Sequence, residues 1–288
     1  MKFSYFPGCA GHSTARDQDL STRGVLSALG ITLTELEDWN CCGATPGHTI
    51  GGALSLALNL RNLSIASDTK CDLLVPCASC FGNLKRAEAA AKRGDVLADF
   101  EDAPSPSSTI SVVSIVDTLS QSEVLAKINL QRCADLSRLN LVAYYGCLLV
   151  RPMETTSAQD AENPTGIEAV LTACGASIVD WPHKTDCCGG PHTISHPELV
   201  TRLAGRLVDR ARRFGANAIV TACPMCHASL DTVQWEARRS GERRSDPLPV
   251  FYLSEIVGVA LALKTQRSWL KRHLIDPRPF LKEHGALK

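Results

Sequence analysis

Short apolar stretches alternate along the chain with longer segments whose apolar residues recur at helical spacing. The short stretches predict β-strands at residues 3–6, 31–36, 72–75, 139–145, 177–181 and 218–222. The longer segments predict helices at residues 16–29, 48–66, 79–92, 164–173 and 198–214, with a further helix after Cys226. Strands that alternate with helices predict parallel sheets covered by helices, so the expected fold class is α/β.

Cysteine is the residue that stands out, because the chain of 288 residues contains 13 of them. Ten of the cysteines form two sets with the same internal order: a single cysteine, an adjacent pair, and a Cys-x-x-Cys motif. The first set is Cys9, Cys41, Cys42, Cys77 and Cys80, and the second is Cys147, Cys187, Cys188, Cys223 and Cys226. In both sets, 34 residues separate the adjacent pair from the motif.

The residues that flank these cysteines repeat as well. Phe-Pro-Gly-Cys at 6–9 matches Tyr-Tyr-Gly-Cys at 144–147, and Asn-Cys-Cys-Gly at 40–43 matches Asp-Cys-Cys-Gly at 186–189. A unit that returns after 138 residues indicates a duplication. We therefore predict two pseudo-symmetric Rossmann-like halves: a first cysteine-rich half at 1–110, a helical connection at 111–138, and a second cysteine-rich half at 139–288.

Each cysteine motif follows a predicted strand. In open parallel sheets the carboxyl ends of the strands meet at one edge, where such folds gather their ligands. We therefore expect the three cysteine-bearing loops of each half to converge. Gly43, Gly189 and Gly190 lie beside the adjacent pairs, where glycine permits a tight backbone path.

Five thiolates in each half exceed what the common metal sites need. Four cysteines complete a tetrahedral zinc site or an ordinary cubane iron–sulfur cluster. Adjacent cysteine side chains tend to diverge, which suits a larger or opened cluster better than a single metal ion. The spacing therefore favours a non-cubane iron–sulfur cluster, with structural zinc and dithiol chemistry as the alternatives.

Charge and composition exclude several other classes of function. Thirty basic residues balance thirty acidic ones, and aromatic residues make up 5%, which argues against nucleic-acid binding. The apolar stretch at 250–263 is shorter than the ~20 residues of a membrane span and predicts a core or interface helix. The N-terminus does not resemble a secretory signal, so we expect a cytoplasmic protein whose thiols stay reduced.

The cysteine pattern and its flanks resemble the duplicated cysteine-rich (CCG) module found in the B subunits of heterodisulfide reductases. The resemblance includes Tyr-Phe-Pro-Gly-Cys at 5–9, Glu-Asp-Trp-Asn-Cys-Cys-Gly-Ala at 37–44, and Tyr-Tyr-Gly-Cys-Leu at 144–148, and it covers essentially the whole chain. The glycolate oxidase iron–sulfur subunit and lactate-utilisation proteins are similar in the same module.

This resemblance implies two non-cubane [4Fe-4S] clusters, one per half, that together cleave a disulfide. The implied ligands are the five cysteines of each set. It also implies two partners, a ferredoxin-like iron–sulfur C subunit and a flavin-containing A subunit. Methanogen members carry histidine where this chain has Leu148. That difference leaves room for the sulfur-oxidising branch of the family and for a sulfur-carrier substrate.

Residues outside the two sets are weaker candidates. His48 and His192 follow the adjacent pairs and are candidate proton donors, although a histidine at a helix start is the more ordinary interpretation. His183 and His227 are weaker candidates still. Cys71, Cys133 and Cys174 have no counterpart in the opposite half and are predicted to be small buried side chains. Four cations could attract an anionic substrate but are more often solvated: Arg16, Arg23, Arg151 and Lys184.

Three functional hypotheses follow. The first is a catalytic, heterodisulfide reductase-like subunit in which clusters carry the redox chemistry on a disulfide or sulfur substrate. The second is a non-catalytic electron-relay subunit of a flavin-containing oxidoreductase. The third is a structural protein stapled by zinc, which predicts a colourless chain without iron.

Overall fold

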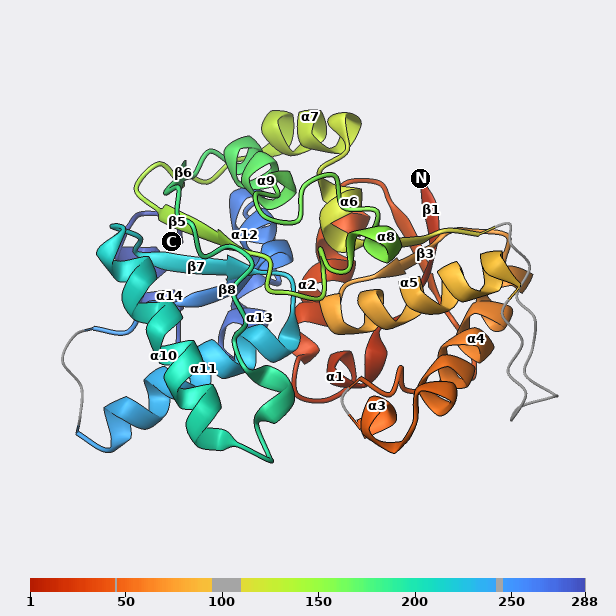
Figure 1. Ribbon diagram of the computed structural model, residues 1–288. Helices are drawn as coiled ribbons and strands as arrows, with labels where there is room; N and C mark the ends of the chain where they lie inside the picture. The colour runs from red at the N-terminus through yellow and green to blue at the C-terminus, as the bar shows by residue number, and fades with distance from the viewer. Residues whose placement is uncertain (45, 95–109, 242–245, 288) are drawn as a thin grey trace.

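The computed structural model describes residues 1–44, 46–94, 110–241 and 246–287. Two four-stranded sheets, parallel throughout, lie side by side within this part of the chain, with strand orders β2-β1-β3-β4 and β6-β5-β7-β8 (Figure 1). The strands are β1 Lys2–Tyr5, β2 Thr32–Glu35, β3 Leu73–Val75, β4 Val112–Ser114, β5 Asn140–Tyr144, β6 Ser177–Ile178, β7 Ala218–Thr221 and β8 Val250–Tyr252. The predicted α/β fold of two pseudo-symmetric Rossmann-like halves is confirmed.

Helices follow the strands in both halves. Those of the first half and the connection are α1 Gly8–Gly11, α2 Arg16–Ala28, α3 Pro46–Ile50, α4 Gly52–Asp68, α5 Ala78–Arg93, α6 Ile115–Leu119 and α7 Ser122–Gln131. Those of the second half are α8 Met153–Thr156, α9 Gly166–Cys174, the 3-10 helix η1 Gly190–His192, α10 Pro197–Arg213, α11 Pro224–Arg239, α12 Leu253–Ala260, α13 Gln266–Leu270 and α14 Arg278–Glu283. The helix predicted at 48–66 is two helices, because Gly51 adopts an extended conformation between α3 and α4.

Helices on both faces of each sheet bury the central strands. Every residue of β3 and β7 is buried, which explains their continuous apolar sequences. The edge strand β2 has no fully buried residue, so polar threonines alternate there with less exposed positions. Side-chain burial thus accounts for the strand positions that the apolar pattern predicted.

The fourth strand of each sheet was not predicted. β4 and β8 are three residues long and run directly into α6 and α12, so neither shows the alternation typical of a strand. The backbone N–H of Ser114 donates to Asp117, and that of Tyr252 donates to Glu255, each at 3.0 Å. These equivalent caps show that the duplication extends through the fourth strand and the helix after it.

The apolar stretch at 250–263 therefore begins as a strand rather than as one helix. All residues of β8 and α12 are buried, as expected for a core or interface element. Among the residues that the structure describes, no helix combines the length and the apolar character needed to cross a bilayer.

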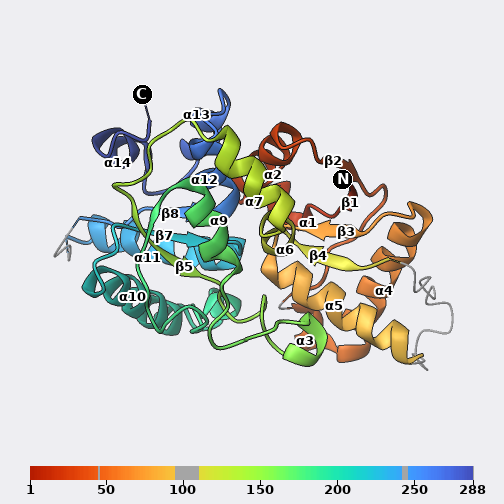
Figure 2. The same cartoon turned by 90° about the horizontal axis from the view of Figure 1, so that it is seen from above.

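The two halves contact each other reciprocally. Helix α2 of the first half packs against α12 of the second, while α9 of the second packs against α6 and α7 (Figure 2). The hydroxyls of Ser21 and Ser254 lie 2.7 Å apart across this interface. Because each half supplies a helix to the other, the positions of the two sheets are coupled.

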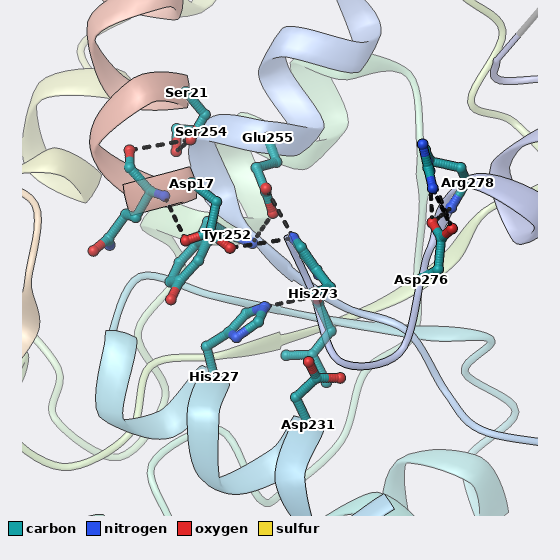
Figure 3. Close-up of polar contacts among 12 residues, drawn as sticks. Asp17, Ser21, His227, Asp231, Tyr252, Ser254, Glu255, His273, Asp276 and Arg278 are labelled. Carbon is teal, nitrogen blue, oxygen red and sulfur yellow. Dashed lines mark hydrogen bonds and ion pairs between the residues drawn. The ribbon is translucent and has the colours of Figure 1, made fainter. Parts of the chain in front are cut away.

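A buried polar network closes the interface beside α2 and α12. The Nε2 atom of His273 lies 2.9 Å from Glu255 Oε1 and 3.7 Å from Asp17 Oδ2 (Figure 3). The ring of His227 stacks on Tyr252, with centroids 4.3 Å apart, and meets the edge of His273. Nε2 of His227 also lies 3.0 Å from the carbonyl oxygen of Val250. Both histidines are therefore held by protein atoms.

Burial and charge shift the protonation equilibria of this network. Burial alone would lower the pKa of His273, but the carboxylates of Glu255 and Asp17 outweigh it and raise that pKa to about 9. Burial, reinforced by the charge of Glu255, raises the pKa of Asp17 to about 6. Burial also raises the pKa of Asp231, on α11, to about 6. The network thus favours bound protons in the folded state.

We expect the free energy of unfolding to fall as the pH rises from 6.5 to 9. A raised pKa in the folded state means that protonated His273 contributes its full stabilisation below its usual pKa of 6.5, and loses it as the pH passes about 9. The loss should be on the order of 3 kcal/mol. Anaerobic urea unfolding across this pH range measures it. His273→Gln should flatten the slope, whereas His196→Gln, which replaces an exposed histidine, should retain it.

Candidate metal centre

The cysteine motifs follow the carboxyl ends of the strands, as the topology requires. In the first half, Cys9 lies in α1 just after β1, the adjacent pair follows β2, and Cys77 caps α5 directly after β3. The second half repeats this order, with Cys223 capping α11 directly after β7. All 13 cysteines are free thiols.

The five cysteines of the first set form one continuous group. Cys9 Sγ lies 3.7 Å from Cys41 Sγ, and Cys42 Sγ lies 3.3 Å from Cys80 Sγ. Cys41 and Cys42 are also close enough to shift each other's pKa, as are Cys77 and Cys80. We call these five residues the first cysteine group.

The five cysteines of the second set meet in the same way and form the second cysteine group. Cys188 Sγ lies 3.5 Å from Cys226 Sγ. Cys147 and Cys187 are close enough to shift each other's pKa, as are Cys223 and Cys226. Three equivalent pairs make the same contacts in the two halves, so the duplication extends to the arrangement of the sulfur atoms.

The two cysteine groups adjoin each other. The thiols of Cys77 and Cys223, the first cysteines of the two Cys-x-x-Cys motifs, are neighbours across the interface between the halves: their interaction raises the pKa of Cys77 and lowers that of Cys223. Both side chains are buried. By contrast, Cys9, Cys41 and Cys187 are exposed. The ten sulfur atoms therefore form a double site with a buried centre and an exposed rim.

Crowding separates the pKa values of the thiols. Hydrogen bonds from Cys42 and Cys9 lower the pKa of Cys41, and one from Cys147 lowers that of Cys187 to about 6. The same contacts raise the pKa of Cys9 and Cys147 well above the usual value of 9.0. Five thiols at these distances repel one another when ionised, so a bound cation is needed to keep all of them as thiolates.

The glycine that precedes the first cysteine of each group leaves space for the sulfur atom of the last cysteine of the same group. A Cβ atom on Gly8 would lie 3.0 Å from Cys80 Sγ, and one on Gly146 would lie 2.9 Å from Cys226 Sγ. Both glycines have φ near +70°, a conformation that other residues rarely adopt. Gly43 and Gly189, which the sequence placed beside the adjacent pairs, also have positive φ angles.

Asparagine and tyrosine side chains hold the cysteine loops from behind, and sequence reasoning missed them. Nδ2 of Asn59 donates to the carbonyl oxygen of Cys42 at 2.9 Å, and Nδ2 of Asn83 donates to the same oxygen at 3.2 Å. In the second half, the hydroxyl of Tyr144 donates to the carbonyl of Asp186 at 2.6 Å. A signal was available, because Asn59 is a buried polar residue in a helix otherwise rich in Ala and Leu.

The candidate histidines have different environments. His48 belongs to α3, but its side chain lies outside the described residues. His192 is exposed, and its charge contributes to the lowered pKa of Cys187. His183 contacts Trp181 and lies 3.0 Å from Asp186, which is a structural role. His227 belongs to the buried network at the interface described above.

Three of the four candidate cations are paired with carboxylates of the protein. Arg23 contacts Asp19 and stacks on Tyr5. Lys184 is buried and lies 2.7 Å from Glu168. Arg151 lies 2.6 Å from Glu162. Arg16 is exposed at the start of α2 and follows Cys9 in the sequence by seven residues.

The three unmatched cysteines lie outside both groups. Cys174 is fully buried in α9, as predicted. The prediction for Cys133 was wrong, because this residue follows the end of α7 and is exposed, with its thiol donating to the Gln131 carbonyl. Cys71 is half-buried in the turn before β3. Position at the end of an element, rather than residue type, decides the exposure of the last two.

Comparison with known proteins identifies the repeated unit. The cysteine-rich domain family CCG matches residues 3–85 and again residues 141–231. The 8-methylmenaquinol:fumarate reductase membrane anchor subunit of Wolinella succinogenes is 30% identical over 279 residues, which cover 96% of this chain and 97% of that protein. The B subunit of the ferredoxin:CoB-CoM heterodisulfide reductase of Methanosarcina mazei is 25% identical over 291 residues, which cover 97% of this chain and 96% of that protein.

Two further similarities are partial. The glycolate oxidase iron-sulfur subunit of Escherichia coli is 24% identical over 77% of this chain and 52% of its own length. A crystal structure of a hypothetical protein from Helicobacter pylori has a TM-score of 0.72 at 12% identity, and shows the same fold. The similarity covers 95% of this chain and 51% of that protein, so this chain spans about half of its length.

These matches coincide with the structure. Each matched segment contains one complete cysteine group and three of the four strands of one sheet. The relatives that align along nearly the whole chain include heterodisulfide reductase B subunits, so the resemblance that the sequence indicated is confirmed. The chain belongs to the cysteine-rich CCG domain family and carries two copies of its domain.

Proposed function

We propose that this protein is the catalytic iron–sulfur subunit of a heterodisulfide reductase-like oxidoreductase. The observation that carries the proposal is the contact between two groups of five thiols at the carboxyl edges of two sheets. Two non-cubane [4Fe-4S] clusters would be held by Cys9, Cys41, Cys42, Cys77 and Cys80 in the first half, and by Cys147, Cys187, Cys188, Cys223 and Cys226 in the second.

The donor set fits such clusters. Five sulfur atoms per half exceed the four that zinc or a cubane cluster takes, and the contacts of Cys9 with Cys41 and of Cys42 with Cys80 support a shared cluster. Iron would also supply the positive charge that this crowding of thiolates requires. When bound, clusters of this kind accept and release single electrons and offer iron to a sulfur ligand.

The protein itself orients and shields the sulfur atoms. The backbone N–H groups of Gly189 and Gly190 donate to Cys187 Sγ and Cys188 Sγ, each at 3.3 Å. Such donors stabilise thiolate charge and favour the reduced state of a bound metal group. Six of the ten cysteines are buried: Cys42, Cys77, Cys80, Cys188, Cys223 and Cys226. A substrate therefore approaches from the exposed rim, near Cys9, Cys41 and Cys187.

We propose a disulfide or a carrier-bound sulfur group as the substrate. Several relatives are named as the B subunits of heterodisulfide reductases, which are enzymes of more than one subunit. Leu148 directly follows Cys147 and packs against Gly82, at the position where methanogen members carry histidine. This substitution favours a substrate of the sulfur-oxidising branch. Exposed His192, beside Cys187, is the candidate proton donor there.

Partners would supply the electrons. We propose a ferredoxin-like iron–sulfur C subunit and a flavin-containing A subunit, since the ten grouped cysteines are all committed to the double site. The alternative is an electron-relay subunit. The name of the Wolinella succinogenes relative supports it, because that protein belongs to a menaquinol:fumarate reductase.

Turnover distinguishes catalysis from relay. Anaerobically purified protein should contain about eight irons per chain and should oxidise reduced viologen when a low-molecular-weight disulfide is added. Absence of turnover in iron-replete protein across a panel of disulfides would favour the relay. A colourless protein with about two zinc ions would contradict both proposals.

Removal of one ligand should affect one half. Cys41→Ser or Cys187→Ser should each lose about half of the bound iron, because the two groups hold separate clusters. Iron and protein assays on anaerobic samples measure this loss. Cys133→Ser, which changes an exposed cysteine outside both groups, should retain all of the iron. Loss of nearly all of the iron in either ligand variant would refute the assignment of separate sites.

The close approach of glycine to sulfur gives a further test. Gly146→Ala should lose about half of the iron, because its Cβ would lie 2.9 Å from Cys226 Sγ. Gly215→Ala is the matched control, because Gly215 also has a positive φ but its Cβ would meet open space. Both variants carry the backbone strain of about 1 kcal/mol, so a difference in iron content isolates the contact with sulfur. Equal iron contents would show that Gly146 has no role in the site.

A further inference from the structure

Gln18 connects the two cysteine groups from the inside of the protein. It lies in the first turn of α2 and is 3% exposed. Its Nε2 atom donates to the carbonyl oxygen of Pro76 at 3.1 Å and to that of Ala222 at 2.8 Å. A carboxamide nitrogen has two N–H groups, so both bonds can form together.

The two acceptors occupy equivalent positions in the duplication. Pro76 directly precedes Cys77, and Ala222 directly precedes Cys223. The thiols of these two cysteines form the contact between the groups. One side chain therefore binds the backbone of both Cys-x-x-Cys loops at the point where the groups meet.

Gln18 is itself held against both halves. The hydroxyl of Ser21 donates to the backbone carbonyl of Gln18 at 3.1 Å and also lies 2.7 Å from Ser254 on α12. Asp17, the preceding residue, contacts His273 of the second half (Figure 3). These contacts fix the start of α2 on the second half, so Gln18 is a rigid link rather than a flexible one.

We propose that Gln18 is a positioning residue that sets the distance between the two cysteine groups. The proposal rests on the proposed function, because this distance is also the spacing of the two clusters. Electron exchange and magnetic interaction between two metal centres both fall steeply with their separation. Loss of the link leaves two buried carbonyl groups without this donor, and the loops relax to find other partners. The link thus keeps the clusters close enough to act as a pair.

Gln18→Met tests the proposal, with Gln234→Met as a matched control. Methionine has a similar length and no N–H donor. Gln234 is likewise buried, and its Nε2 donates to Leu230 at 3.0 Å and Leu248 at 2.9 Å, but both acceptors belong to the second half. Holoproteins are prepared anaerobically and partly reduced. Iron content and the spin–spin interaction between the clusters are then measured by electron paramagnetic resonance.

We expect all three proteins to contain the same iron, and the interaction to change at least twofold in Gln18→Met alone. An unchanged interaction in Gln18→Met overturns the positioning role, as does an equal change in Gln234→Met. Should Gln18→Met fail to load iron, Gln18→Asn takes its place. This variant keeps the amide but is one methylene too short to reach both carbonyls. The iron content of the wild-type protein tests the proposed function separately. If the two clusters are absent from it, the proposed function is overturned, and the positioning role with it.

Discussion

The shared direction of the strands is the constraint on which the rest of this structure depends. Both sheets are parallel throughout, so every strand delivers its following loop to the same edge. Three loops of each half carry cysteine. Sulfur atoms from different loops of one half approach each other to 3.3–3.7 Å. An antiparallel strand in either sheet would send one motif to the opposite edge. Strand direction, rather than any single contact, assembles the ten thiols.

The site also depends on how the halves are joined. The contact of Cys77 with Cys223 crosses the interface, so its geometry is only as rigid as the packing of α2 on α12. That packing is reinforced by polar groups with few solvent contacts, including Glu255 and His273. Buried ion pairs add little to stability compared with apolar packing, but they penalise displacement strongly. The network is thus suited to holding one arrangement of the two halves.

Sequence alone predicted the α/β fold, the duplication and the grouping of the cysteines, because each follows from local patterns. Apolar spacing indicated the strands, and the repeated intervals between Cys41 and Cys80 and between Cys187 and Cys226 indicated the equivalent loops. The strands β4 and β8 were not predicted because each runs directly into an apolar helix, with no turn residue to separate the two elements. Gln18 and His273 were missed for another reason, which is that each has a partner far away in the chain. Gln18 binds Ala222, 204 residues away, and His273 contacts Asp17 near the opposite end of the sequence. Only the folded structure brings such pairs together.

The reciprocal exchange of helices has an evolutionary consequence. Helix α2 packs against the second half just as α9 packs against the first. This reciprocal arrangement is that of an isologous contact between identical subunits. A single-copy ancestor with these surfaces would have paired with itself through the same face. Fusion of two such copies preserves that twofold contact within one polypeptide while freeing each copy to diverge. Gln18, one residue of the first copy that binds the backbone of both copies, is a departure from that twofold symmetry.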